Sequence, residues 1–141
     1  MLPQTTLDNI AHHITTDVDG CLGASIVDRD TGFAFSATPA GTNIDINVAA
    51  AFYAQAVNAK EKTLRALGGT RDLDDMVVTF EDEMHIITAI DANKFVFAVF
   101  HPDVDPIAQL HATIAYHSAT SLGTIPNIFR ARRAAAEHFA A

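Results

Sequence analysis

The chain has 141 residues, a formal net charge of −8 at pH 7 and 49% hydrophobic residues. This length suits one domain, and the acidic balance argues against nucleic acid or an anionic membrane as the main partner, because both bind through a surplus of Lys and Arg. A single cysteine, Cys21, excludes an internal disulfide and a multi-cysteine zinc site, and we interpret it as a small buried hydrophobic residue.

No secretory signal and no apolar run of about 18 residues is visible, so the sequence predicts a cytoplasmic protein without direct membrane insertion.

A first helix is expected over residues 6–17. Thr5 and Asp8 have the spacing of a capping box, apolar residues then recur at helical spacing, and Gly20 closes the segment. Next, residues 21–27 and 33–36 flank a turn that ends in Gly32, which predicts a hairpin followed by a loop over 39–43.

A long second helix is expected over residues 45–67, with Asp45 as its cap and Gly68 and Gly69 at its end. Its apolar residues cover two stripes, whereas a helix that lies on one core needs a single stripe. The first stripe is Ala49, Phe52, Ala56, Ala59, Thr63 and Leu67, and the second is Ala50, Tyr53, Val57 and Leu64. Two stripes indicate two neighbours, and the second neighbour is expected to be another copy of the chain or a different protein.

Three apolar runs follow at 76–80, 85–90 and 95–100, and their short connections predict an antiparallel meander. Asp105 and Pro106 then begin a third helix, which places Ile107, Leu110, Ile114 and His117 on one face. Residues 119–124 are interpreted as a small-residue linker, and 125–141 as either a helix or a frayed tail. The domain is therefore expected to span 1–119, with a C-terminal tail over 120–141.

Most strands are apolar at consecutive positions, which is typical of strands covered on both faces. The sequence predicts an α+β fold in which one antiparallel sheet lies between helical layers. The first and third helices are expected on one face and the second helix on the other.

Residue patterns for catalysis or metal binding are missing from the sequence. His12 and His13 point to different faces of their helix, as do His111 and His117, and the remaining histidines are interpreted as surface or structural residues. The acidic clusters at 72–75 and 81–83 are interpreted as solvated turns, and neither a phosphate-binding loop nor a nucleophile elbow is present. We therefore expect a non-enzyme with no cofactor and no metal site.

Residues 20–33 read Gly-Cys-Leu-Gly-Ala-Ser-Ile-Val-Asp-Arg-Asp-Thr-Gly-Phe, and an alanine-rich helix follows. With the order of the elements, this segment resembles the Roadblock family of dynein light-chain-type proteins over residues 7–119. The resemblance implies a five-stranded antiparallel sheet with helices on both faces, in α-β-α layers like those of profilin and longin domains. It also implies a non-catalytic homodimer, whose bacterial relatives are partners or activators of Ras-like small GTPases.

In such a homodimer the second helices pack antiparallel and the third strands pair across the two-fold axis. Mapped onto this chain, the implied interface consists of Ala49, Phe52, Tyr53, Ala56, Val57, Met76, Val77, Val78, Thr79 and Phe80. Phe52→Asp or Val57→Asp is then expected to break the dimer.

Two alternatives remain open at this stage. One is a dimeric scaffold without coupling to a GTPase, and the other is a small-ligand sensor, which needs a cavity with convergent polar groups.

Arg29 at the hairpin tip suggests an arginine finger, but we interpret it as an exposed turn residue. The basic residues Lys60, Lys62, Arg65, Arg71, Arg130, Arg132 and Arg133 are either solvated or contacts for an acidic partner.

Overall fold

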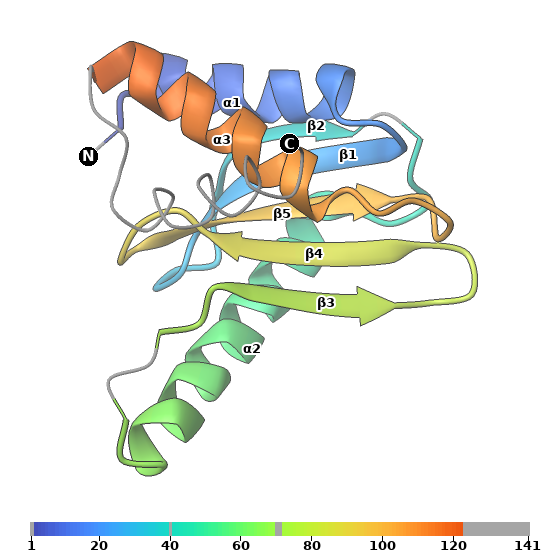
Figure 1. The fold of residues 1–141 in the computed structure, drawn as a ribbon. Coiled ribbons are helices and arrows are strands. Elements are labelled where there is room, and N and C mark those ends of the chain that lie inside the picture. The colour runs from blue at the N-terminus through green and yellow to red at the C-terminus, as the bar shows by residue number, and fades with distance from the viewer. Residues whose placement is uncertain (1, 40, 70–71, 123–141) are drawn as a thin grey trace.

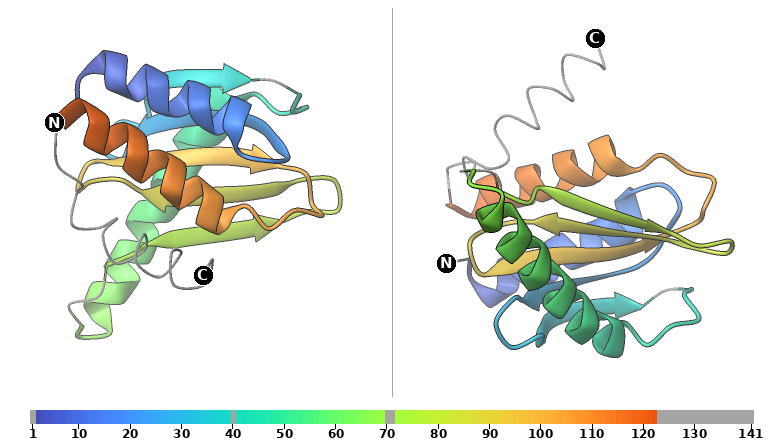
Figure 2. Two further views of the ribbon diagram at one scale, coloured as in Figure 1. Left: turned by 45° about the horizontal axis from the view of Figure 1, so that its top comes forward. Right: turned by 90° about the horizontal axis from the view of Figure 1, so that it is seen from below.

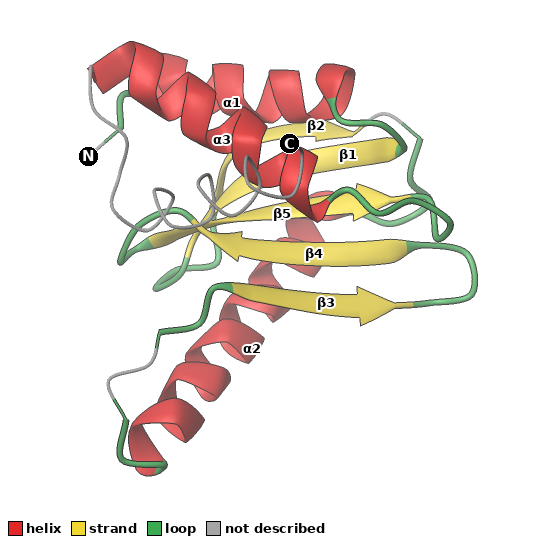
Figure 3. Ribbon diagram, viewed as in Figure 1, coloured by secondary structure: helices red, strands yellow, loops and turns green. Residues whose placement is uncertain are grey.

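The structure is a computed structural model, and it describes residues 2–39, 41–69 and 72–122. Three helices and five strands follow one another along this part of the chain (Figures 1 and 3). In order they are α1 (Gln4–Asp17), β1 (Cys21–Asp28), β2 (Ala34–Pro39), α2 (Ile46–Ala66), β3 (Asp75–Thr79), β4 (Met84–Ala89), β5 (Lys94–Phe100) and α3 (Ile107–Leu122).

The five strands form one antiparallel sheet in the order β2-β1-β5-β4-β3. This confirms the predicted hairpin and meander, and it makes β2 and β3 the two edge strands. The predicted strand limits differ by up to three residues from the observed ones. Pro39, for example, belongs to β2 instead of the following loop. An edge strand tolerates a proline because the backbone on its outer side needs no N–H donor for a neighbouring strand.

Helices cover both faces of the sheet, as the apolar strands predict (Figure 2). On one face, α1 and α3 pack against a core that includes Ile26, Ile86 and Phe100. On the other face, α2 packs against a second core that includes Ile87 and Phe97. All seven residues of the central strand β5 are buried, because both layers cover it.

The start of α1 differs from the predicted capping box. The helix begins at Gln4, and Pro3 at the N-cap makes no side-chain cap hydrogen bond. Thr5 lies inside the first turn and not before it, and the carbonyl of Pro3 accepts the first helical hydrogen bond, from Leu7 N at 3.1 Å. The expected Thr5–Asp8 capping box is therefore wrong.

The caps of α2 agree with the sequence. The Asp45 carboxylate accepts hydrogen bonds from the backbone N–H groups of Asn47 at 3.0 Å and Val48 at 3.3 Å. At the other end Gly68 has a φ of +78°, the left-handed conformation in which glycine ends a helix at low cost.

Helix α3 continues through Leu122, so the linker predicted from residue 119 is wrong. Residues 119–122 are small or aliphatic and include neither Gly nor Pro, and a helix can therefore continue through them. Residues 123–141 lie outside the described part, and so do the tail arginines Arg130, Arg132 and Arg133 and also Arg71. The domain boundary at 119/120 stays a prediction.

Candidate interaction surface

Helix α2 turns one stripe of its surface toward its own sheet. Its buried residues are Ile46, Ala50, Ala54 and Val57, and Tyr53 beside them packs on Phe97 with ring centroids 4.9 Å apart. The second predicted stripe, to which Tyr53 and Val57 belong, thus faces the core of the chain itself.

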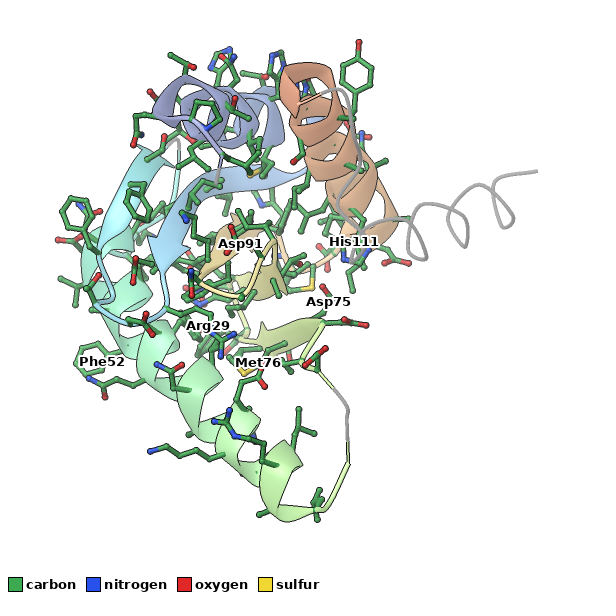
Figure 4. All side chains as sticks on the ribbon, turned by 90° about the vertical axis from the view of Figure 1, so that its left-hand side faces the viewer. Arg29, Phe52, Asp75, Met76, Asp91 and His111 are labelled. Atoms are coloured by element: carbon green, nitrogen blue, oxygen red, sulfur yellow. The ribbon has the colours of Figure 1, made fainter. Side chains whose placement is uncertain are left out.

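The opposite side of α2 carries large apolar side chains that nothing in the described chain covers. Phe52 is 66% exposed and Val48 is 54% exposed, and Figure 4 shows Phe52 pointing away from the sheet. Ala49 and Ala56 lie half-buried along the flanks of the helix, and Ala49 also packs against the chain's own core. Together these four residues form the outer face of α2.

The second half of α2 has no core of its own to lie on. Every buried residue of the helix lies at or before Val57, and none of the nine residues from Asn58 to Ala66 is buried. Figure 1 shows why, since the helix crosses the sheet diagonally and its last turns extend past β3. We call these last turns, residues 58–66, the overhang of α2. Leu67 at their end is 74% exposed. A helix end in this position, with the exposed Leu67 beside charged residues, offers contact area to another molecule.

Strand β3 lies beside the overhang, and no described strand pairs with its outer side. Phe80 N donates to Glu83 O at 2.8 Å, and Ala89 N donates to Asp74 O at 3.1 Å. These two hydrogen bonds fix which positions of β3 bond to β4. Alternate positions, including Val77 and Thr79, therefore direct their backbone groups to the open edge. Val77 and Phe80 are 42% and 48% exposed, while Met76 and Val78 are half-buried on the α2 side. An open, apolar edge of this kind is a template for pairing with another strand.

A buried polar chain fastens α2 to the strand next to this edge. Glu83 accepts a hydrogen bond from Nε2 of His85 at 3.0 Å, and Nδ1 of His85 lies 2.6 Å from the hydroxyl of Tyr53. Glu83 also accepts from the Thr42 hydroxyl at 2.9 Å. Burial alone would raise the pKa of Glu83, but these hydrogen bonds outweigh it and hold the pKa below its usual value.

Glu83 and His85 are only 6% and 5% exposed. The interpretation of Glu83 as part of a solvated turn is therefore wrong, because Thr42 from a distant loop covers it. Nothing in the local sequence around residue 83 indicates that partner. His85 is a structural histidine, as expected.

On the other side of the sheet, Asp75 links β3 to α3. Its carboxylate accepts from Nε2 of His111 at 2.9 Å and from the Thr88 hydroxyl at 2.7 Å, and Figure 4 shows Asp75 beside His111. Asp75 is thus a strand residue with buried partners and not a solvated turn residue. The open edge strand is thus linked directly to α3, while the polar chain from α2 reaches its neighbour β4.

Arg29 is not the exposed turn residue that the sequence indicated. Its side chain is 16% exposed, its guanidinium lies 3.7 Å from the Glu61 carboxylate, and it donates to the carbonyl of Ala92 at 3.2 Å. Asn58 also donates to the backbone carbonyl of Arg29 at 2.9 Å. The hairpin turn packs against α2, so these contacts hold the guanidinium inside the chain and it does not project as a finger.

A cleft of about 440 Å³ opens beside Arg29, between α2 and the ends of the neighbouring strands. Its wall includes two arginines and three carboxylates, of which Arg29 and Glu61 form an ion pair at 3.7 Å. Its lining residues are Arg29, Glu61, Arg65, Asp72, Leu73, Ala89, Asp91 and Ala92. Arg29 already has structural partners here, and a small ligand would have to displace them.

Neither a model of a protein family nor a curated protein matches the sequence. Solved structures do match, and they define the chain as an α+β protein of the Roadblock/LC7 fold. It is similar to a Roadblock/LC7 domain from Streptomyces avermitilis, with 17% identity and a TM-score of 0.68 over 84% of this chain and 98% of that one.

The fold is also similar to that of two MglB proteins. Myxococcus xanthus MglB matches with 14% identity and a TM-score of 0.72, over 87% of this chain and 93% of that one. The gliding protein MglB of Thermus thermophilus matches with 15% identity and a TM-score of 0.63, over 98% of this chain and 93% of that one. These likenesses confirm the fold that the resemblance implied.

Within the described residues, every helix is too short or too polar to span a lipid bilayer.

Proposed function

We propose that this protein is a homodimeric adaptor that binds a Ras-like small GTPase and influences its nucleotide state or its localisation. The observation that carries the dimer is the overhang of α2 past the open edge of β3. In an isologous dimer, the overhanging end of each helix lies on the partner's sheet beside the partner's β3, and the two β3 edges pair.

The proposed interface joins the outer face of α2 with the edge strand. It uses Phe52, Ala49 and Ala56 from α2 and residues 76–80 from β3. Tyr53 and Val57 of the sequence-based set lie against the chain's own core, so their part is to position α2. Aromatic and aliphatic side chains around an unpaired strand are the composition expected of a permanent interface.

The GTPase part of the proposal rests on the Roadblock/LC7 fold and on the family resemblance of residues 20–33. Arg29 is engaged by Glu61 and Asn58, so the proposed mode of action does not insert an arginine into the GTPase site. Instead, the adaptor acts by binding and positioning the GTPase's own groups.

A binding titration tests this function. The full chain is titrated against the Ras-like GTPase encoded nearest to it, loaded in turn with GDP and with a GTP analogue, while hydrolysis is followed in parallel. We expect tighter binding to one nucleotide state. Equal binding to both states would reduce the proposal to a scaffold, and failure of both states to bind would overturn the GTPase assignment.

A further inference from the structure

We propose that His13, Asp17 and His117 form a binding site for a divalent transition metal ion such as Zn²⁺, and that the bound ion fastens α1 to α3. This site lies on the face of the sheet opposite α2. It is independent of the proposed dimer and GTPase partner.

The geometry of the three side chains carries the proposal. His13 and Asp17 stand four residues apart, on one face of α1, with Nδ1 of His13 2.8 Å from the Asp17 carboxylate. The ring of His117 on α3 stacks on the ring of His13, with centroids 3.9 Å apart and an angle of 12° between the planes. Two parallel imidazoles and a carboxylate therefore meet at the seam between two helices.

One ion can bridge this set after a small adjustment. One ligand atom from each residue lies within 4.8 Å of the other two. Around a tetrahedral zinc ion with bonds of about 2.0–2.1 Å, ligand atoms stand about 3.3 Å apart, so the set needs to contract by at most about 1.5 Å. The nitrogen lone pairs of stacked rings run nearly parallel, so the imidazoles of His13 and His117 must also rotate out of their stack to point at one ion.

The donor set selects the class of metal. Two imidazole nitrogens and one carboxylate oxygen suit Zn²⁺ and its neighbours in the transition series, with water completing the coordination, whereas Mg²⁺ and Ca²⁺ prefer oxygen ligands throughout.

The spacing of histidines in the sequence shows only whether two of them share one face of the same helix, so the sequence did not indicate this site. His13 and His117 are 104 positions apart, and only the packing of α1 against α3 brings them together. That packing is visible in Gln109, which donates to the backbone carbonyl of Asp17 at 2.9 Å, about two turns before His117.

The test uses the full chain without a histidine tag, stripped of metal by a chelator. Zn²⁺ is added while binding is followed by calorimetry and thermal unfolding. We expect one ion per chain and a rise in melting temperature, because the ion binds the folded state, and no such rise with Mg²⁺. His13→Asn, Asp17→Asn and His117→Asn should each weaken binding by about tenfold or more. His12→Asn is the matched control, since His12 is exposed and adjacent but lies outside the set, and it should bind as the unaltered chain does.

A second measurement needs no variant and therefore no assumption about folding. In the imidazole NMR spectrum of the unaltered chain, one equivalent of Zn²⁺ should shift the resonances of His13 and His117 and leave those of His12 in place. Failure to bind at millimolar Zn²⁺ would overturn the proposal, and so would shifts confined to other histidines or equal losses in His117→Asn and His12→Asn.

Discussion

The hydroxyl of Tyr53 on α2 donates a hydrogen bond to Nδ1 of His85 on β4, across 2.6 Å. The direction is that of the neutral imidazole, in which Nε2 of His85 donates to the Glu83 carboxylate and Nδ1 accepts. The helix that carries the exposed Phe52 is thereby fixed to the strand that pairs with β3. The two halves of the proposed interface are held in register by one buried polar chain.

Tyr53→Phe removes the donor of this bond and leaves Nδ1 of the buried His85 without a partner. We expect the free energy of unfolding to fall by about 1–2 kcal/mol, measured by urea denaturation at fixed chain concentration. The control is Tyr116→Phe, since Tyr116 is 63% exposed. Equal losses in the two variants would contradict the structural role of the polar chain.

Glu83 makes the stability of the fold dependent on pH. Its pKa in the folded protein is lowered from the usual 4.5, so the unfolded state binds protons more readily. The stabilisation that the Glu83 carboxylate gives the folded protein is therefore present above about pH 4.5. It is lost as the pH falls through the lower pKa that Glu83 has in the folded state. Glu83→Gln should be less stable at pH 7, with a flatter loss of stability between about pH 5 and pH 3.

The matched control for Glu83 is Asp17→Asn. The pKa of Asp17 is also lowered, chiefly by its hydrogen bond with His13, but the pair lies on the surface. Salt screens an exposed pair, so the effect of Asp17→Asn should shrink in high salt while that of Glu83→Gln persists. If both effects vanish in salt, Glu83 does not act as a buried group.

Phe52→Asp should convert the dimer to a folded monomer. Phe52 is exposed in the single chain, so a carboxylate there leaves the fold intact, but in the interface it is buried without a partner at a cost of several kcal/mol. Light scattering gives the mass and circular dichroism checks the fold. Asn9→Asp is the control, because Asn9 is exposed on α1, on the opposite side of the sheet, and this variant should stay dimeric.

Val57→Asp, which the sequence also predicts to break the dimer, is expected to act on the fold of the single chain as well. Val57 is 3% exposed in the single chain, so the charge is buried in the chain's own core. The variant should lose about 4 kcal/mol of stability and unfold before it dissociates, as a urea titration followed by circular dichroism would show.

Val77→Pro tests the strand edge separately from the helix. The backbone N–H of Val77 points to the open side of β3, so a proline there blocks pairing with a second copy but removes no hydrogen bond to β4. We expect a folded monomer. Val78→Pro is the counterpart, because it removes a bond to β4 and should destabilise the chain itself. Dimerisation of Val77→Pro with unchanged affinity would exclude β3 from the interface.

Local patterns predicted the elements and the layers well. Asp45 and Gly68 mark the ends of α2 through backbone chemistry that is independent of the rest of the fold, and the unbroken apolar run of β5 follows from its cover on both faces. The partners of Glu83 and Arg29 could not be predicted, because Thr42 and Glu61 reach them only through tertiary packing. For the same reason, the two stripes could be separated but not assigned, since the sequence does not show whether the stripe of Val57 or that of Phe52 faces the sheet.

Sedimentation equilibrium of the full, unaltered chain at micromolar concentration is the sharpest test of the proposed dimer. We expect a species of 30.2 kDa, twice the chain mass of 15.1 kDa. A species of 15.1 kDa under these conditions would contradict the proposal, because the overhang of α2 and the open edge of β3 would then have no second copy to cover them.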